Sequence, residues 1–430
     1  MKIALIRIMS CAAVRKLAIA LLICCTFTPQ PAQAYSVFTH EEIIDILWPT
    51  QLTALIKQRF PGITPEQLQE AHAYAYGGAV IQDLGYYPFG SAYFSDLVHY
   101  VRSGDFVSNL IAGAQDPDEY AFALGALAHY ASDLCGHPAV NRSVALMYPK
   151  LERKYGPLVT YEQDKTAHLN TEFGFDVLQV AKQRFNFDQY HSFIGFQVSK
   201  PALERAFKDT YGIDVGSVLH EDLAIGSFRW AVSGVIPQMT KVALATRNKE
   251  DLHINERDTA ARRKFLYHIS RSDYEREFGN KYVRPGTGAK IIALLMHIVP
   301  KIGPFKGLKY KDPTPRTQDL YYKSVDATVD LYRAEIRTLQ QNGGRRISLP
   351  NRDFDTGKPT LPGEYALTDQ THAKLALQLE KDGFAQSPQP VRAYLEEYFR
   401  EAKAHPLKHP SKEFLQADRD LGSAAPIAEQ

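Results

Sequence analysis

Apolar residues recur at helical spacing through most of this 430-residue sequence. Residues at i, i+3, i+4 and i+7 share one face of an α-helix, so the pattern is typical of amphipathic helices that bury one side. Alternating runs that end in tight hairpin turns, as strands would, are hard to find. The sequence therefore predicts an all-α fold, with helices in the windows 41–60, 67–80, 121–134, 167–183, 218–245, 316–340, 371–381 and 390–402.

Local signals divide these helices from one another. Thr39 ahead of Glu42, and Thr64 ahead of Gln67, have the spacing of helix-capping boxes. Residues 343–363 are rich in Gly and Pro, which predicts an extended loop. Residues 405–430 are polar and predict a disordered tail. The apolar run 291–299 is interpreted as a buried core helix, with contact to a membrane surface as the alternative.

The first 34 residues have the composition of a signal peptide. A positively charged start precedes the apolar run 17–25, and Ala32-Gln33-Ala34 supplies a small-x-small cleavage pattern. The apolar run is too short to cross a bilayer of roughly 30 Å. We therefore predict cleavage after Ala34, export to the periplasm or the medium, and no transmembrane segment in the mature protein.

The cysteine content and the net charge limit how the mature chain can be stabilised and which partners it can bind. Three of the four cysteines lie within the predicted signal peptide, so Cys135 alone remains and cannot form an intrachain disulfide. The stability of the mature chain must come from its core, from metal or from both. The net charge of +2 gives no sign of a basic surface for nucleic acid.

The strongest chemical motif is a stripe of three side chains. His129, Asp133 and His137 follow one another at steps of four residues. Each step turns a helix by about 400°, so the three side chains project from one face. Imidazole and carboxylate groups that converge are suited to a divalent ion, because each supplies a lone pair and the carboxylate offsets charge. A metal site is predicted, with a satisfied polar network in the core as the alternative.

Two further motifs repeat this chemistry. His168 and Glu172 again have the i, i+4 spacing of one helix face, and Asp83 is followed across a Tyr-Tyr-Pro loop by Asp96 and His99. A single His–Glu pair on a helix is more often a surface or structural pair. Together with the stripe, however, these motifs fall within one third of the chain, and coincidence is a poor explanation for all of them.

The predicted N-terminus of the mature chain provides a fourth group of candidate metal ligands. His40 lies five residues after Tyr35, the predicted first residue of the mature chain. A free α-amine and its adjacent carbonyl can chelate a metal ion, so signal cleavage would create a ligand at Tyr35. The remaining histidines lack comparable partners and are interpreted as ordinary structural or surface residues; these are His72, His191, His220, His253, His268, His297, His372, His405 and His409.

Five motifs together resemble a known family. They are YSVFTH (35–40), GGAVIQDLGYYP (77–88), FSDLVH (94–99), HYASDLCGH (129–137) and AHLNTEFGFD (167–176). They are similar to the zinc-dependent phospholipase C family, including the branch with the catalytic domain of glycosylphosphatidylinositol phospholipase D. More distantly, they resemble the single-strand-specific zinc nucleases. The likeness covers about residues 35–180.

The resemblance implies three zinc ions. One would bind Asp83, His99, His129 and Asp133. A second would bind Tyr35, through its amine and carbonyl, with His40 and a bridging Asp133; the third would bind His137, His168 and Glu172. Tyr35 stands where the bacterial enzymes and the nucleases have Trp, and the four-residue step from Asp133 to His137 looks more like the phospholipase D branch.

The resemblance also implies roles and an organisation. Asp83 would act as general base or water-orienting group as well as ligand. From its position in the sequence, Asp96 is a candidate to orient a ligating imidazole, with an exposed loop acid as the alternative. Tyr86, Tyr87 and Phe89 would line an apolar mouth or serve as ordinary packing. The expected parts are a signal peptide (1–34), a helical zinc-dependent hydrolase domain of the phospholipase C type (35–310), a helical C-terminal extension (311–404) and a disordered tail (405–430).

The predicted function is hydrolysis of a phosphodiester, with a phospholipid as the first choice of substrate. A zinc nuclease or another phosphodiesterase is the alternative, and an envelope protein in which zinc only holds the fold together is the second alternative. Contact with a membrane surface is compatible with the first of these. Asn351, Asp353 and Asp355, followed by Gly357, resemble an incomplete calcium loop, although a polar turn is the preferred interpretation.

Overall fold

The computed structural model describes residues 37–181, 195–237, 239–240, 310–381, 383–384, 387–404, 407 and 410–423. Within these ranges the chain is helical, and the only extended pairing is an isolated bridge between Arg352 and Pro359. The predicted all-α fold is confirmed. The predicted signal peptide, Tyr35 and the apolar run 291–299 lie outside the described residues. In the part that is described, no helix combines the length and the apolar character needed to cross a bilayer.

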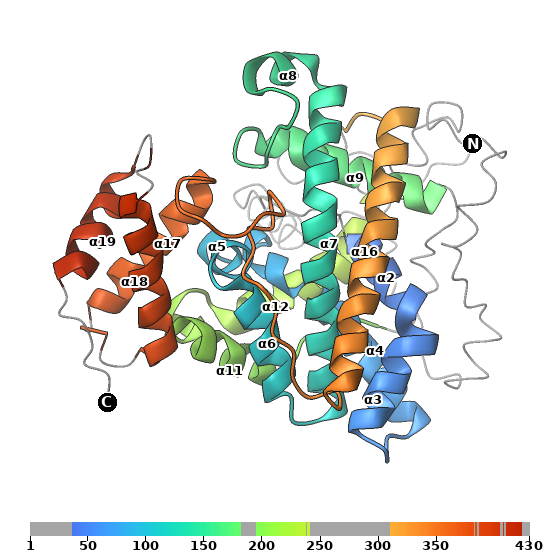
Figure 1. Cartoon of the computed structure of the whole chain (residues 1–430). Coiled ribbons are helices and arrows are strands. Elements are labelled where there is room, and N and C mark those ends of the chain that lie inside the picture. Colours follow the sequence, from blue (N-terminus) through green and yellow to red (C-terminus); the bar gives the residue numbers. More distant parts are fainter. Residues whose placement is uncertain are drawn as a thin grey trace, which may run out of the picture.

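Helix α7 (Pro117–Met147) runs through the centre of the molecule (Figure 1). Asp116 caps its first turn by accepting a hydrogen bond from the Glu119 backbone amide at 2.8 Å, and Pro117 supplies the fixed φ that suits a first helical position. Helix α4 (Pro65–Ala79) and helix α16 (Pro315–Gln341) pack along it more extensively than any other elements. Two helices that are more than 200 residues apart in the sequence therefore flank the same helix.

Two glycines let α4 and α7 approach closely. A Cβ atom at Gly78 would lie 1.9 Å from the carbonyl oxygen of Phe122, and one at Gly125 would lie 2.1 Å from that of Ala75. These neighbours are backbone atoms, which cannot move aside as a flexible side chain would. The helices touch at a distance that only glycine permits at these two positions.

The other elements surround this pair. The first are α2 (Val37–Leu47), a π-helical turn η1 (Trp48–Leu52), α3 (Thr53–Arg59), the 3-10 helix η2 (Ile81–Tyr86), α5 (Ala92–Tyr100) and α6 (Ser103–Gly113). They are followed by α8 (Pro149–Tyr155), α9 (Lys165–Ala181), α11 (Lys200–Tyr211), η3 (Val215–Ser217), α12 (Glu221–Trp230) and the π-helical turn η4 (Ala231–Val235).

The capping predictions have opposite outcomes. Thr64 and Gln67 form the expected reciprocal box at the start of α4, with distances of 3.2 and 2.9 Å. Thr39 instead lies inside α2, and its hydroxyl donates a hydrogen bond to Asp176 at 3.0 Å. The prediction for Thr39 is wrong because a buried carboxylate on α9 takes the hydroxyl that would have capped a helix.

The C-terminal helices form a separate group at one side of the molecule (Figure 1). They are α17 (Ala366–Glu380), α18 (Gln389–Ala404) and α19 (Lys412–Ser423). The prediction of a disordered tail from residue 405 is wrong for Lys412–Ser423, because Phe414, Ala417 and Leu421 bury their side chains in the core. Residues 342–365, between α16 and α17, form the expected extended loop apart from turns and the single bridge.

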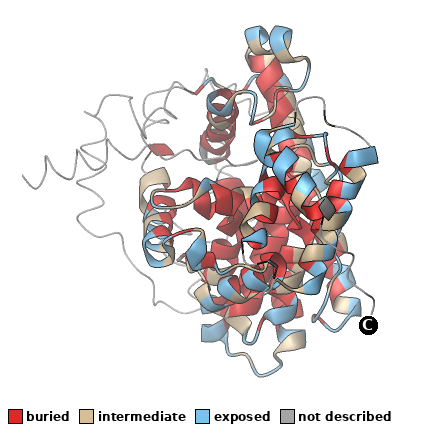
Figure 2. Cartoon of the chain, turned by 90° about the vertical axis from the view of Figure 1, so that its left-hand side faces the viewer, coloured by how far each residue is buried: buried red, intermediate tan, exposed pale blue. Residues whose placement is uncertain are grey.

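The buried residues lie on the inner faces of the packed helices (Figure 2). One continuous apolar cluster joins residues from α2 through α12 with residues from α16 to α19. The extension expected after residue 310 therefore shares its core with the preceding helices. This core holds the helix faces that carry the predicted donors in fixed positions.

Candidate metal centre

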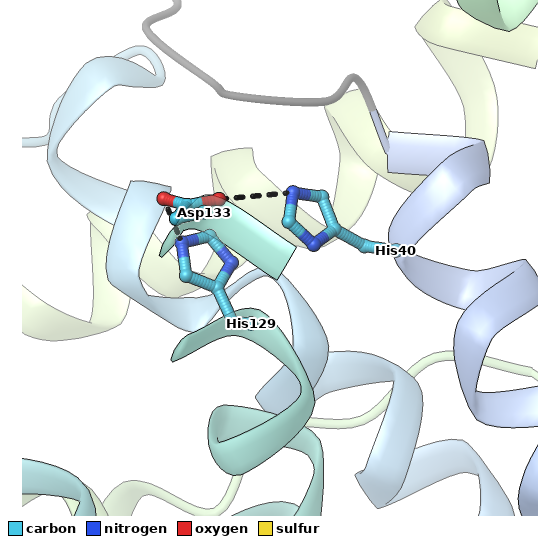
Figure 3. A group of neighbouring side chains, drawn as sticks. All are labelled: His40, His129 and Asp133. Atoms are coloured by element: carbon cyan, nitrogen blue, oxygen red, sulfur yellow. Dashed lines mark ion pairs between the residues drawn. The ribbon is translucent and has the colours of Figure 1, made fainter. Parts of the chain in front are cut away.

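The stripe on α7 faces inward, as its spacing predicted. His129, Asp133 and His137 are 0, 0 and 2% exposed. The step of four residues places them one above the other along the helix, toward α2, α5 and α9. Figure 3 shows His129 and Asp133 projecting from α7 toward His40 on α2.

Asp133 lies at the centre of the donors. Its Oδ2 is 3.0 Å from His129 Nε2, 3.4 Å from His99 Nε2 and 3.5 Å from His137 Nε2. Its Oδ1 faces the other way, 3.8 Å from His40 Nε2. One carboxylate thus meets imidazoles from three helices, a position suited to a bridging ligand.

Asp83 approaches from the 3-10 helix η2, at the end of α4. Its Oδ1 lies 3.5 Å from Nε2 of His99, which is on α5, and its side chain is fully buried. The tight turns of η2 and the loop that follows carry the chain from Asp83 to Ser91 and into α5. Ser95 fixes this connection, because its hydroxyl donates to the Gln82 carbonyl at 2.6 Å and accepts from the Gly85 amide at 3.0 Å.

His168 and Glu172 come from α9. His168 Nε2 and Glu172 Oε1 are 2.7 Å apart, both side chains are buried, and the ring centroid of His168 lies 5.2 Å from that of His137. The pair is therefore adjacent to the C-terminal end of the α7 stripe. An i, i+4 pair that would be unremarkable on a surface helix here faces the other donors.

Among the described residues, three groups have donor atoms close enough to share an ion. They are His40, His129 and Asp133; Asp83, His99 and His129; and His137, His168 and Glu172. Ligands about 2.0–2.1 Å from a tetrahedral zinc ion lie roughly 3.3 Å from one another, which is the scale of the separations given above.

The donors fit a cation because their close polar contacts are mainly with one another. Within the described part of the chain, both oxygens of Asp83 and Asp133, Nε2 of His129 and both ring nitrogens of His168 are buried and form no hydrogen bond. A buried polar atom without a partner costs about 1–3 kcal/mol, and more if it is charged. A bound cation would offset this cost, and nitrogen and carboxylate donors are those that zinc prefers.

Two imidazoles are held with one nitrogen toward the cluster. Nδ1 of His99 donates to the carbonyl of Ser95 at 2.7 Å, and Nδ1 of His129 donates to that of Ala79 at 2.9 Å, which leaves each Nε2 deprotonated in the neutral ring. Anchoring of the second nitrogen is the usual way in which proteins orient metal-binding histidines.

The electrostatics of the cluster are unbalanced without a cation. Burial alone would raise the pKa of Asp133, but the imidazoles of His129, His137 and His99 outweigh it and hold that pKa well below its usual range. Burial, with the nearby carboxylates, raises the pKa of Glu172 well above its ordinary value. A divalent ion would stabilise both carboxylates in their charged form.

Two other predictions concern residues that surround the candidate ligands. The role of Asp96 in orienting a ligating imidazole stays a prediction. A carboxylate that the sequence did not suggest for this role, Asp355, lies beside His137, with Oδ1 3.0 Å from Nδ1. Asp355 belonged to the candidate calcium loop, but its neighbours there face elsewhere: Asn351 accepts from the Gly104 amide at 3.0 Å and Asp353 from the Thr356 amide at 2.9 Å. This divergence agrees with the polar turn rather than a calcium site. Sequence spacing held no signal for a partner more than 200 residues from His137.

The fold and the donor set define a class: a helical protein with a buried histidine–carboxylate cluster whose donors are suited to divalent ions. Residues 39–220 match the family model described as zinc dependent phospholipase C, a segment that includes every donor from His40 to Glu172. The match supports the zinc-dependent phospholipase C family suggested by the sequence motifs. No curated protein and no solved structure matches the chain.

Proposed function

We propose that this chain is an exported zinc-dependent phosphodiester hydrolase, and that its substrate is a phospholipid cleaved in the manner of a phospholipase C. The observation that carries the proposal is the meeting of three donor groups in one buried site. The family match over residues 39–220 supports the same chemistry. A purely structural ion needs only one closed tetrahedral set, whereas clustered sites suit attack on a phosphodiester.

The proposed ligand sets follow the sequence motifs. Asp83, His99, His129 and Asp133 would hold one ion, and His137, His168 and Glu172 another. His40 and Asp133, with the amine and carbonyl of Tyr35 at the mature N-terminus, would hold a third. His129 lies close both to Asp83 and His99 and to His40 and Asp133, so its assignment to the first ion rests on the resemblance.

Zinc, when bound, supplies charge that offsets the anionic phosphate oxygens and lowers the pKa of water toward about 7. The chain supplies the proton acceptor and the geometry. The Asp83 carboxylate is fully buried beside the other donors, in a position to accept a proton within the cluster. Asp83 would accept the proton of the attacking water, and the anchored rings of His99 and His129 would keep the reacting groups in line.

Aromatic residues beside the donors support a lipid substrate. Tyr86 and Tyr161 form a small cluster with Leu169 and Leu367, separate from the main core. The Tyr86 ring lies 5.9 Å from that of His99, and the Tyr161 ring lies 5.7 Å from that of His168. An apolar wall thus borders the donors at two places, as a site that receives the glycerol and acyl portion of a lipid requires.

The test is hydrolysis of defined phospholipid vesicles by the mature protein, with its zinc content and N-terminal residue measured first. Phosphatidylcholine, phosphatidylethanolamine, phosphatidylglycerol and phosphatidylinositol form the panel. The two expected products are diacylglycerol and the released, phosphorylated head group. Asp83→Asn should lower turnover about 100-fold or more, because it removes both the proposed base and a charged zinc ligand.

The other outcomes identify the alternatives. Phosphatidic acid as the product would indicate phospholipase D cleavage, and digestion of single-stranded DNA without lipid turnover would indicate a nuclease. Bound zinc with no turnover of any phosphodiester would contradict the enzyme and favour a structural role for the metal. An extra residue ahead of Tyr35 should lower the zinc content by one ion if the amine is a ligand.

A further inference from the structure

A short segment from the C-terminal third of the chain lies directly on the donor cluster. We call residues 349–357 the strap. Its backbone is fixed at several points: Tyr130 donates to the Pro350 carbonyl at 2.8 Å, Ser103 donates to the Arg352 carbonyl at 2.6 Å, and the Phe354 amide donates to the His99 carbonyl at 3.3 Å. These contacts come from α5, α6 and α7, so the strap spans the elements that carry the donors.

Phe354 places an apolar ring against two of the imidazoles. It is fully buried, and its centroid lies 5.2 Å from that of His99 and 6.2 Å from that of His129. The ring excludes water from the side of these histidines that faces the strap. It also limits the rotation by which either imidazole could leave the cluster.

Asp355 brings a carboxylate to a third imidazole. Its Oδ1 lies 3.0 Å from Nδ1 of His137, a close charge contact that is not a linear hydrogen bond. Its Oδ2 accepts from the hydroxyls of Tyr100, at 3.2 Å, and Tyr365, and its backbone carbonyl accepts from Asn141 at 2.7 Å. The side chain is 1% exposed, and groups from α5, from α7 and from the residue that precedes α17 hold Asp355 in one position.

The two nitrogens of His137 thus face opposite ways. Nε2 points to Asp133 at the centre of the cluster, 3.5 Å away, while Nδ1 points to Asp355. Asp355 lies behind the imidazole and is absent from the donor groups found among the described residues. Its chemistry is that of a carboxylate that fixes a histidine ring and raises the basicity of the nitrogen on the far side.

Pro138 explains how the strap comes so near to α7. Its ring nitrogen cannot donate to the carbonyl of Leu134, one turn earlier, so that carbonyl is exposed to a neighbour. Gly357, with φ +69°, approaches this point so closely that a Cβ there would lie 2.8 Å from the Leu134 oxygen and 3.2 Å from Pro138 Cγ. A residue with a side chain would lift the strap from the turn that carries Asp133 and His137.

We propose that Asp355 is a positioning residue for His137, and that the strap makes the C-terminal region an integral part of the zinc centre. This inference rests on the proposed zinc ligands. It assigns a role to a residue outside the segment of the family match, residues 39–220. The strap, which lies between α16 and α17, would then support catalysis by holding a metal ligand in place.

The test is the zinc affinity of the full mature chain, measured by competition with a zinc-buffering chelator and by metal content after dialysis. Asp355→Ala should weaken one ion by about 10–100-fold and leave the others bound. Asp355→Asn keeps an acceptor oxygen but loses the charge, so an intermediate loss, roughly threefold to tenfold, is expected. With cobalt in place of zinc, the visible spectrum of Asp355→Ala should change because the geometry at His137 changes.

Asp353 supplies the matched control. It lies on the same strap, is 3% exposed, and accepts hydrogen bonds from Thr356 and Thr368 rather than contacting an imidazole. Asp353→Ala and Asp353→Asn should leave the zinc affinity and the cobalt spectrum unchanged. If Asp355→Ala fails to fold, the comparison of Asp355→Asn with Asp353→Asn carries the test.

Several results would overturn the inference. One is wild-type affinity for every ion in the folded Asp355 variants. Another is an equal loss in the Asp353 variants, which would mean that the strap acts through general stability. Either result leaves the proposed function intact if the wild-type chain binds zinc and cleaves a phosphodiester. A wild-type chain without zinc would overturn both proposals.

Discussion

A single carboxylate couples the separate parts of the donor cluster. Asp133 approaches imidazoles that come from α2, α5 and α7, and it uses different oxygens for His40 and for the others. Neither helix periodicity nor local hydrogen bonding requires a charged residue there. A buried aspartate among several imidazoles is instead explained by the charge of the ions that such a group would share.

His372 shows how a buried histidine differs from those of the cluster. Its Nδ1 donates to the Thr368 carbonyl at 2.8 Å, and its Nε2 faces the Tyr394 hydroxyl at 3.1 Å. Its ring stacks on that of Tyr398, with centroids 3.6 Å apart. Both nitrogens are satisfied in the neutral ring, which agrees with its interpretation as structural.

This arrangement predicts a pH dependence of stability. Burial lowers the pKa of His372 from 6.5 to about 3. The unfolded chain therefore binds a proton below pH 6.5 that the folded chain does not, and stability falls with decreasing pH from about 6.5 toward 3. At pH 5 the loss is about 2 kcal/mol relative to neutral pH. His372→Phe keeps an aromatic ring but cannot titrate, so it should remove this part of the loss.

Urea unfolding of the metal-free proteins at pH 7.5 and pH 5.0 measures the effect. His220→Gln, at an exposed histidine, should retain the wild-type pH dependence. The same loss of stability in His372→Phe and in the wild type would show that another group is responsible.

The donors show what sequence can and cannot predict at the scale of a residue. The stripe from His129 to His137 and the pair His168 and Glu172 are predictable because helical geometry relates positions four apart. Asp355 is not, because its partner lies more than 200 positions away and is reached through an irregular loop. Helical periodicity gives no information about where such a loop crosses the fold.

At the scale of an element, the contact between α4 and α7 determines the position of several donors. The Ala79 carbonyl at the end of α4 accepts from His129 Nδ1 at 2.9 Å, and η2 carries Asp83 directly afterwards. Gly78 precedes Ala79 and forms part of the closest approach to α7. A displacement of α4 would therefore move the anchor of one ligand and the backbone of another.

Gly78→Ala tests this coupling. The added Cβ would meet the Phe122 carbonyl oxygen at 1.9 Å and the Ala126 nitrogen at 3.1 Å, both backbone atoms. We expect the free energy of unfolding to fall by about 3 kcal/mol or more, and zinc affinity to fall with it. Urea denaturation and chelator competition measure the two effects.

Gly226→Ala is the matched control. Gly226 lies within α12, and no atom would lie within 4 Å of its added Cβ. Alanine is the better helix former by about 1 kcal/mol, so this variant should be neutral or slightly more stable. If Gly78→Ala kept wild-type stability and zinc affinity, the close approach of α4 and α7 would not matter to the site.

The presence of most helices could be predicted from the spacing of apolar residues, but the residues at which several helices begin and end could not. The window 316–340 became α16 almost unchanged, whereas 121–134 is only the middle of α7. The window 41–60 is interrupted by the π-helical turn at Trp48–Leu52, which contains Pro49. Helix α19 was missed because its amphipathic face is short and becomes meaningful only against α17 and α18.

At the scale of the whole molecule, the core and the donor cluster use both ends of the chain. Helix α16 packs along α7. Tyr332 on α16 donates a hydrogen bond to the carbonyl of Leu124 on α7 at 2.8 Å. The strap that follows α16 then reaches the donors. The C-terminal region therefore supports the site from two directions, so the folding of the chain and the binding of metal are expected to be coupled.

Metal removal tests this coupling across the molecule. Without a cation, burial lowers the pKa of His99, but Asp133 and Asp83 outweigh it and raise that pKa to about 10. A proton can thus replace part of the missing charge, and we expect the metal-free chain to remain folded but weakened. A site with free zinc at 100 times its dissociation constant stabilises the fold by about 2.7 kcal/mol, and three such sites by roughly 8 kcal/mol.

For a chain of this size, that stabilisation corresponds to a decrease in melting temperature on the order of 10 °C when a strong chelator removes the ions. Scanning calorimetry with and without chelator measures the decrease, and added zinc should reverse it. Asp133→Asn should show a smaller response to chelator, because it binds fewer ions before treatment. An unchanged melting temperature after verified removal of all zinc would mean that the buried donors are already satisfied by protons and by one another, and would contradict the coupling between metal and fold.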